Sequence, residues 1–256
     1  MRDHTPETSL PHLPAGTYDS CLVTKLEHYL DMTPEERGML STLEKTEQPV
    51  ASGDEVFIGG EPNRHLFVVK HGWLYAHTYL PDGGRLVVRI YNAGDIVGLS
   101  SLAFDAHVVN LRAASDACLC PFPRNRLDQV IRSTPRIAAL LFTLAAREET
   151  ILIDSLRAAS RMRPDARLAQ LLLNLHARLK ITNTTMRRSF RLPLTQTDIG
   201  DAVGLTNVTV SRTLSQMADQ GWIKRREGAI TLLDIDTLAK LCDFQNRHES
   251  IDTSWF

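Results

Sequence analysis

The side chains best suited to chemistry lie between residues 195 and 225, where hydroxyl, amide and guanidinium groups recur at short intervals. Such groups bond to phosphates and to the edges of nucleic-acid bases. An arginine such as Arg212 can donate hydrogen bonds to either kind of group. We therefore expect DNA contacts from Thr195, Gln196, Thr206, Asn207, Val208, Thr209, Ser211, Arg212, Ser215, Lys224 and Arg225.

Two short helices are expected to position these groups. Thr195 and Asp198 form a T-x-x-D capping pattern at the start of the first helix. Gly204 can end that helix, because glycine adopts a positive φ at little cost. Thr206 can cap the second helix, whose apolar stripe is Val210, Leu214, Met217 and Ala218. Two helices joined by a glycine turn predict a helix-turn-helix, although a plain helical hairpin with a solvated face would show the same pattern.

The residues after these helices favour the DNA-binding interpretation. Apolar runs at 222–223 and 229–233 flank a charged turn, which predicts a β-hairpin, or wing, carrying basic residues. Residues 161–226 hold twelve Lys and Arg against four Asp, whereas the first 120 residues hold nine Lys and Arg against sixteen Asp and Glu. The whole chain is near neutral, with a net charge of −1, so its charge is divided between a basic part and an acidic part. The basic part is expected to face nucleic acid, and the acidic part is expected not to.

The N-terminal half has a different pattern. Between Val50 and Phe122, β-branched and aromatic runs such as HLFVVKHGWLYAHTYL are broken by glycines and by turn dipeptides. Short runs with turns at this spacing predict a β-sandwich or barrel.

A long helix is predicted from Ser133, with apolar residues on one stripe over about six turns. A small β-barrel would cover only part of it, so we expect a coiled-coil seam with a second copy; a long helix packed within one chain is the alternative. Arg163-Pro164 interrupts the pattern and predicts a hinge. The expected dimerisation residues are Ile137, Leu141, Leu144, Ile151, Leu152 and Leu156.

Composition excludes several classes of protein. The chain has 256 residues, of which 43% are hydrophobic, enough for two domains. It has no apolar run long enough for a membrane span and no secretory signal, so a cytoplasmic location is expected. The four cysteines do not suggest a disulfide framework. Catalytic residues and a metal site are not expected: nucleotide-binding, nucleophile-elbow and zinc-protease motifs are missing, and His71 and His77 lack the spacing of a cupin-like enzyme.

The order of these parts resembles the Crp/Fnr superfamily of bacterial regulators. The most specific segments are LTQTDIG at 194–200, GLT at 204–206, TVSR at 209–212 and AGDIVG at 93–98, and they are closer to the Fnr/FixK/Dnr-like branch than to the cyclic-AMP receptor branch. The resemblance implies an α+β fold with an N-terminal β-roll like a cyclic-nucleotide-binding jelly roll, a long dimerisation helix and a C-terminal winged helix-turn-helix. The expected parts are a flexible lead (1–20), the β-roll (21–132), the dimerisation helix (133–160) and the DNA-binding domain with a C-terminal tail (161–256).

The resemblance also implies partners and contacts. Members act as homodimers on two-fold symmetric DNA and touch RNA polymerase. Arg212 matches the family arginine that pairs with guanine, and Ser211 matches a base-contacting serine. The family usually has a glutamate where this chain has Val208, so we expect a half-site that departs from the usual TTGAT-like sequence at that position.

The signal is less clear from the sequence. Cyclic-nucleotide-binding members have a glutamate after Gly-Asp-x-x-Gly and a later Arg-Ser pair, whereas this chain has Leu99-Ser100-Ser101 and His107-Val108. We therefore do not expect cyclic AMP, because its phosphate would lack charge-assisted contacts. A cyclic-nucleotide-responsive regulator of the same fold remains the alternative, with Arg89 or Arg112 as a substitute cation. The expected effector pocket is Arg89, Gly98, Leu99, Ser100, Ser101 and His107.

Cofactor chemistry is left open by the sequence. An iron–sulfur cluster needs four cysteine ligands, and only Cys21 lies in the N-terminal region where oxygen-sensing members place theirs, which argues against a cluster. Haem stays possible, with His28, His65, His71, His77 and His107 as candidate ligands. Oxygen, a nitrogen oxide, a redox change and a small molecule all remain open as signals, and the cofactor is unknown.

Overall fold

The computed structural model describes residues 20–256, so the expected N-terminal lead lies outside the described residues except for Ser20. The first elements are α1 (Cys21–Leu26), α2 (Pro34–Ser41) and the 3-10 turn η1 (Thr42–Glu44). Ser20 caps α1 through its hydroxyl. Thr33 and Glu36 form a reciprocal capping box at the start of α2, which satisfies two backbone N–H groups that the helix itself leaves without partners.

Two antiparallel sheets form the β-roll. The first has the order β1 (Gln48–Val50), β8 (Ala117–Pro123), β3 (His65–His71) and β6 (Ile96–Val97). The second has the order β2 (Glu55–Phe57), β7 (Asn110–Ala113), β4 (Leu74–Tyr79) and β5 (Arg85–Tyr91). Val69 and Leu119 from the first sheet share one buried cluster with Leu74 and Leu111 from the second. The predicted β-roll is confirmed, and the 3-10 turn η2 (Leu99–Ser101) follows β6.

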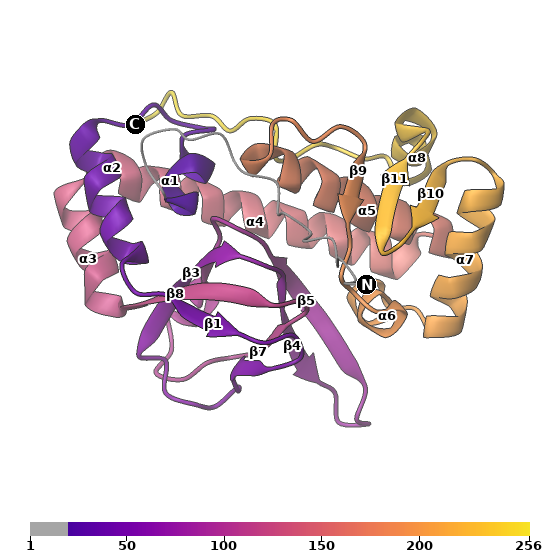
Figure 1. Cartoon of the computed structure of the whole chain (residues 1–256), viewed down its shortest axis with the longest axis horizontal. Coiled ribbons are helices and arrows are strands. Elements are labelled where there is room, and N and C mark those ends of the chain that lie inside the picture. Colours follow the sequence, from indigo (N-terminus) through magenta and orange to yellow (C-terminus); the bar gives the residue numbers. More distant parts are fainter. Residues whose placement is uncertain (1–19) are drawn as a thin grey trace, which may run out of the picture.

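Two helices follow the sheets: α3 (Arg124–Ser133) and α4 (Pro135–Arg161). The sequence pattern does not predict α3, because only Leu127, Val130 and Ile131 among its ten residues are large and apolar. The predicted long helix is α4, which starts with Pro135 at a position where a missing N–H costs nothing. It runs along the β-roll and continues to the C-terminal domain (Figure 1).

The expected dimerisation residues do not all lie on a free face of α4. Leu152 and Leu156 have 56% and 68% of their surface exposed. Leu141 and Leu144 are half-buried against the sensor core, and Ile151 is also half-buried. The expectation that Ile137 lies at the dimer seam is wrong, because this residue is fully buried in its own chain, packed with α1, α2 and the first sheet. The first turn of α4 therefore serves the intramolecular core, and Leu152 and Leu156, the exposed members of the expected set, lie in its C-terminal half.

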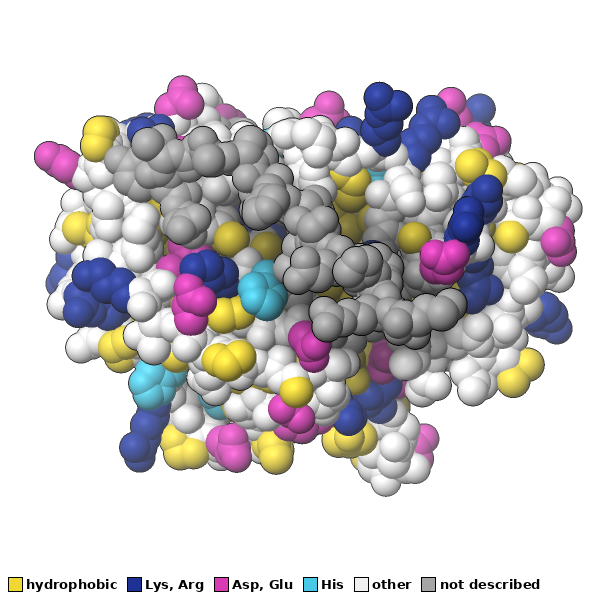
Figure 2. All heavy atoms as spheres, viewed as in Figure 1, with side chains coloured by type: hydrophobic (Ala, Val, Ile, Leu, Met, Phe, Trp, Pro, Cys, Tyr) yellow, Lys and Arg dark blue, Asp and Glu magenta, His cyan; other side chains and the backbone are white. Residues whose placement is uncertain are grey.

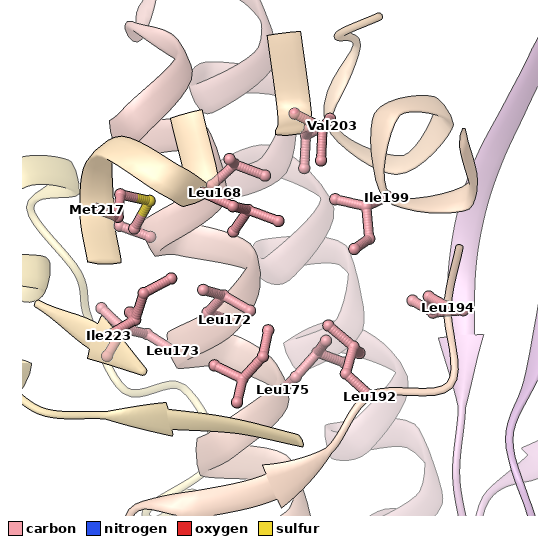
Figure 3. Packing of buried hydrophobic residues seen from close by; sticks show 14 of the residues in the cluster. Leu168, Leu172, Leu173, Leu175, Leu192, Leu194, Ile199, Val203, Met217 and Ile223 are labelled. Atoms are coloured by element: carbon pink, nitrogen blue, oxygen red, sulfur yellow. The ribbon is translucent and has the colours of Figure 1, made fainter. Parts of the chain in front are cut away.

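The C-terminal domain begins after α4 ends at Arg161. Its elements are α5 (Pro164–Thr182), β9 (Ser189–Arg191), α6 (Gln196–Val203), α7 (Asn207–Asp219), β10 (Ile223–Arg226), β11 (Ala229–Leu232) and α8 (Ile235–Cys242). Buried side chains from α5, α6 and α7 converge in its core, among them Leu168, Ile199 and Met217 (Figure 3). The three strands form a separate sheet in the order β10-β11-β9.

The chain after α8 returns to the sensor domain. In Figure 1 this segment runs from α8 back toward α1 and α2. Its His248 is buried, with Nε2 2.6 Å from the Oδ1 of Asn174 on α5, and the His248 carbonyl accepts a hydrogen bond from Tyr29. Ile251 and Phe256 pack against the sensor core. The C-terminal segment therefore ties the two domains together. Among residues 20–256, no helix is both long and apolar enough to span a bilayer.

Candidate nucleic-acid interface

The helix-turn-helix is fixed by side-chain caps at both helix starts. The Thr195 hydroxyl accepts a hydrogen bond from the Asp198 N–H at 3.1 Å, and the Asp198 carboxylate accepts one from the Thr195 N–H at 2.9 Å. Thr206 caps α7 by accepting from the Thr209 N–H at 3.2 Å. Gly204 ends α6 with a φ of +68°. These caps and this stop are predicted by the sequence and confirmed.

The angle between α6 and α7 depends on Gly200, which the capping patterns do not point to. The Leu205 N–H donates to the Gly200 carbonyl at 3.0 Å, so the turn folds back onto α6. A Cβ on Gly200 would lie 2.4 Å from the Leu205 carbonyl oxygen, far inside contact distance. A glycine inside an amphipathic helix was the available signal, since such a residue costs helix stability unless close packing requires it.

α7 separates a buried face from an open one. Val210, Leu214 and Met217 are buried against α5 and the wing. Val208 points away from them with 72% of its surface exposed, and Arg212 is exposed as well. Asn207 and Ser215 are also exposed, whereas Thr209 and Ser211 are half-buried. The predicted base-contacting residues thus share the solvent side of one helix, which is the arrangement needed to enter a major groove.

The wing adds a basic row beside α7. Lys224, Arg225 and Arg226 are exposed, and Arg226 pairs with Glu227 at 3.1 Å. Ala229 of the central strand pairs with Arg226 on one side and with Arg191 on the other, so both arginines occupy one row of the sheet. Arg191 is missing from the predicted contacts because β9 is too short to show a strand pattern. Several Lys and Arg side chains are visible at this end of the molecule in Figure 2.

A groove of about 260 Å³ separates the wing from the two helices. Gln196 of α6 and Leu214 of α7 line one side, and Arg225 and Glu227 line the other. Of the predicted phosphate contacts on the two helices, Gln196 lines this groove and is half-buried, while Thr195 and Thr206 are exposed at the two helix starts. Backbone N–H groups at helix N-termini attract anions, so both starts can hold phosphates.

The expected effector residues fall into two groups: those in and around η2, and Arg89, which lies on β5. Ser101 of η2 is buried, and its hydroxyl accepts from the Val108 N–H at 3.2 Å. His107 is buried and stacks on Phe57 with ring centroids 3.7 Å apart, and burial lowers its pKa. Gly98, Leu99 and Ser100 lead into the same turn.

Arg89 has a different partner from the rest of the expected pocket. Its guanidinium pairs with Glu148 of α4 at 3.1 Å and lies over the ring of Tyr91 at 4.9 Å. In this conformation Arg89 joins the sheet to the long helix, and its charge is already balanced by a carboxylate.

The cysteines and histidines do not form a metal site in the described part of the chain. No group of three His, Cys, Asp or Glu residues within 20–256 has the geometry to hold an ion. Burial raises the pKa of the Cys120 thiol to about 12 and that of Cys242 to about 11. Both thiols are therefore largely protonated at neutral pH, so neither carries the low-pKa thiolate that marks a reactive cysteine.

Comparison with known proteins agrees with both halves of this architecture. The Crp-like helix-turn-helix domain model matches residues 166–241, which include α6, α7 and the wing. The cyclic nucleotide-binding domain model matches residues 47–134, the β-roll and α3. The chain belongs to the Crp/Fnr superfamily. It is a DNA-binding transcription regulator of that type.

Relatives of this Crp/Fnr protein include the transcriptional activator protein Anr of Pseudomonas aeruginosa, which is 27% identical over 91% of this chain and 95% of its own length. The fumarate and nitrate reduction regulatory protein of Escherichia coli is 25% identical over 86% of this chain and 88% of its own. The structure of FixK2 from Bradyrhizobium japonicum covers 77% of this chain and 96% of its own, with a TM-score of 0.69 and 27% identity. These relatives support the placement in the Fnr/FixK branch.

Proposed function

We propose that this regulator acts as a homodimer on a two-fold symmetric DNA site, with α7 of each subunit in the major groove. The observation that carries the proposal is the open face of α7: Val208 and Arg212 are exposed there while the opposite face is buried. The capped turn holds this face in one orientation. A helix held in one orientation with such an exposed face can enter the major groove and read bases directly.

The proposed DNA contacts fall into two groups: side chains that read bases and side chains that bind phosphates. Arg212 pairs with a guanine and Ser211 contacts its neighbour, while Val208 packs on a thymine methyl. Asn207, Thr209 and Ser215 border these on the same helix. Thr195, Gln196, Thr206, Lys224 and Arg225 bind phosphates, which sets the register of the protein on DNA but carries no sequence information.

The second copy would cover the exposed apolar side chains of α4. Phe142, Leu152, Ile153 and Leu156 are all exposed in the single chain. Apolar residues at this helical spacing pair along a coiled-coil seam. Dimerisation through α4 would also place two recognition helices on successive turns of the duplex, as a symmetric operator requires.

The remaining parts of the proposal concern the signal and the location. The β-roll is the sensor and responds to oxygen, a nitrogen oxide, a redox change or a small molecule. Its cofactor is undetermined. The partner in transcription is RNA polymerase. The name of the fumarate and nitrate reduction relative supports a respiratory signal. A protein that binds chromosomal DNA acts in the cytoplasm, and the membrane is not a partner.

Selection from random duplex DNA tests the proposal. The wild-type protein should enrich an inverted repeat, and the Arg212→Ala protein should lose selectivity at the guanine, where a bidentate pair is worth about 1–3 kcal/mol. Arg132→Ala is the matched control, because Arg132 is an exposed arginine on α3 that pairs with Asp128 on the same helix. An Arg212→Ala protein that is folded and dimeric yet binds as selectively as the wild type would refute this role.

A further inference from the structure

The second β-sheet of the sensor forms part of the DNA-binding domain's core. Tyr75 of β4 and Val87 and Ile90 of β5 belong to the same buried cluster as Leu168 of α5 and Ile199 of α6. The two domains therefore meet through packed apolar side chains as well as through the α4–α5 hinge. Apolar contact alone permits sliding, so directional contacts at the edges of this interface decide the orientation.

Arg85, the first residue of β5, makes the directional contact with α6. Its Nε donates to Asp201 at 2.6 Å and its Nη2 donates to Asp198 at 2.5 Å. Its Nη1 donates to the Tyr75 hydroxyl at 2.8 Å. The side chains are largely shielded, with 16% exposure for Arg85, 10% for Asp198 and 20% for Asp201. A planar guanidinium that holds two carboxylates at once fixes both distance and angle, which a single ion pair does not.

Asp198 connects Arg85 to the start of α6, where the proposed phosphate contacts lie. One carboxylate oxygen of Asp198 closes the capping box with Thr195, and the other accepts from Arg85. The residue that caps the start of α6 is thus held by the sensor sheet. Thr195 and Gln196, the proposed phosphate contacts, lie at that same helix start.

We propose that Arg85 is a positioning residue for DNA recognition: it sets the orientation of the helix-turn-helix on the sensor sheet without touching DNA. This inference rests on the proposed function. The contact leaves the reading face open, since Val208 keeps 72% of its surface exposed. In the orientation that Arg85 holds, the reading face is not occluded within the subunit, and losing that orientation weakens binding by adding conformations that cannot bind.

A second contact secures the other end of β5. Arg178 of α5 donates to the Ile90 carbonyl at 2.7 Å and to Asp95 at 2.6 Å, and the side chains of Arg178 and Asp95 are buried. Because Arg178 lies inside the fold, its removal would destabilise the whole molecule. Arg85 lies at the rim of the interface and is the residue whose orienting role can be separated from folding.

The test measures binding of a fluorescein-labelled duplex bearing the inverted repeat selected by the wild-type protein. Arg85→Gln should weaken binding about tenfold, within the usual range of coupling between sites. The slope of log affinity against log salt should not change, because no phosphate contact is lost. The matched control is Arg112→Gln, which removes the same charge from the same sheet; Arg112 bonds to the Gly53 carbonyl within the sensor.

Asp201→Asn supplies the second, independent variant. It removes the charge of one of the two carboxylates that Arg85 holds on α6 and leaves the other carboxylate, Asp198, and its cap in place. Removing a negative charge near DNA would by itself raise the affinity for DNA, whereas loss of positioning lowers it. A purely electrostatic role and a positioning role for Asp201 therefore predict opposite changes in affinity. The Arg85→Gln/Asp201→Asn double variant should bind no more weakly than Arg85→Gln alone, since Arg85→Gln already removes the contact with Asp201.

Each contrary outcome has a distinct meaning. Unchanged or tighter binding by Arg85→Gln, or tighter binding by Asp201→Asn, overturns the positioning role. A salt slope that falls by about 0.9 would show that Arg85 contacts a phosphate directly, which also overturns it. If the wild-type protein selects no DNA, the proposed function itself fails. Circular dichroism and urea unfolding of each variant confirm that the folded protein is being measured.

Discussion

Val208 is the proposed contact for one base pair of the half-site. We predict that Val208→Glu shifts the selected sequence toward the TTGAT-like family site, because a glutamate accepts a hydrogen bond from cytosine N4 and a valine does not. The change in preference at that base pair should be about 1–3 kcal/mol. Selection from random duplexes by both proteins, followed by sequencing, measures it. Val208 is exposed, so the substitution has no folding cost from burial.

Val208→Ile is the control for this prediction. It keeps an apolar contact with the thymine methyl and should select the same half-site as the wild type. An identical consensus from the wild-type protein and the Val208→Glu variant would show that this side chain does not reach a base.

Residue-scale prediction from sequence worked where the cause is local. The Thr195 and Thr206 caps follow from neighbours three residues away, and both are present. Arg85 could not be found in this way, because its partner Asp201 is 116 positions along the chain. A single sequence contains no signal for such a pair until the two elements are placed together.

At the scale of the element, the turn between α6 and α7 depends on Gly200. We predict that Gly200→Ala costs about 2–4 kcal/mol of stability, because the new Cβ would overlap the Leu205 carbonyl and no flexible side chain can move aside. Operator binding should fall with it, since α7 changes its angle to α6. Urea unfolding and DNA titration measure the two effects.

Gly38→Ala is the matched control for Gly200→Ala. Gly38 lies inside α2, and its Cβ would have no heavy atom within 4 Å. The same chemical change should therefore stabilise the protein by about 0.5–1 kcal/mol through helix propensity. Similar destabilisation by both substitutions would contradict the packing argument.

The apolar residues of α4 give the element-scale prediction for assembly. We predict that Leu156→Glu converts the proposed dimer to a monomer, because it places a charge among the exposed apolar side chains without disturbing the core of the chain. Ile137→Glu should instead unfold the sensor, since Ile137 is fully buried in one subunit. Light scattering coupled to size-exclusion chromatography distinguishes these results. A Leu156→Glu protein that stays dimeric would place the interface elsewhere.

The periodicity of α4 shows what element-scale sequence analysis can and cannot determine. A stripe at helical spacing correctly predicts a long helix with a continuous apolar side. It does not say which turns of that side meet the same subunit, because Ile137 and Leu156 look alike in sequence. The answer depends on where α1, α2 and the β-roll end against the helix, which is a property of the assembled fold.

At the scale of the whole molecule, a buried charge network connects the parts. Asp95 accepts from Lys25 of α1 at 2.6 Å and from Arg178 of α5 at 2.6 Å. Glu148 of α4 pairs with Arg89 of β5 at 3.1 Å and with Arg147 at 2.9 Å. Every main part of the described chain thus contributes a charge to one region. Removing one partner leaves a buried charge uncompensated, which makes the arrangement of the domains sensitive to protonation.

Acid should weaken this network through Glu148. Burial raises the pKa of Glu148, but Arg89, Arg178 and Arg147 outweigh it and hold the pKa at about 2, below its ordinary value of 4.5. A carboxyl whose pKa is lower in the folded state stabilises the fold above the unfolded pKa, and this contribution disappears as the pH falls from about 4.5 to about 2. The contribution at pH 7 is at most about 3 kcal/mol.

The difference between wild type and Glu148→Gln isolates this contribution from the other carboxylates, which titrate in both proteins. We predict that Glu148→Gln is less stable than wild type at pH 7, and that the gap in the free energy of unfolding narrows by pH 3, because the wild type then loses what the variant already lacks. Urea unfolding at the two pH values measures the gap. Glu227→Gln, in the exposed turn of the wing, should show no such convergence. A gap that is the same at both pH values would mean that Glu148 stabilises the junction by its shape and hydrogen bonds, and that its charge contributes nothing to holding the domains together.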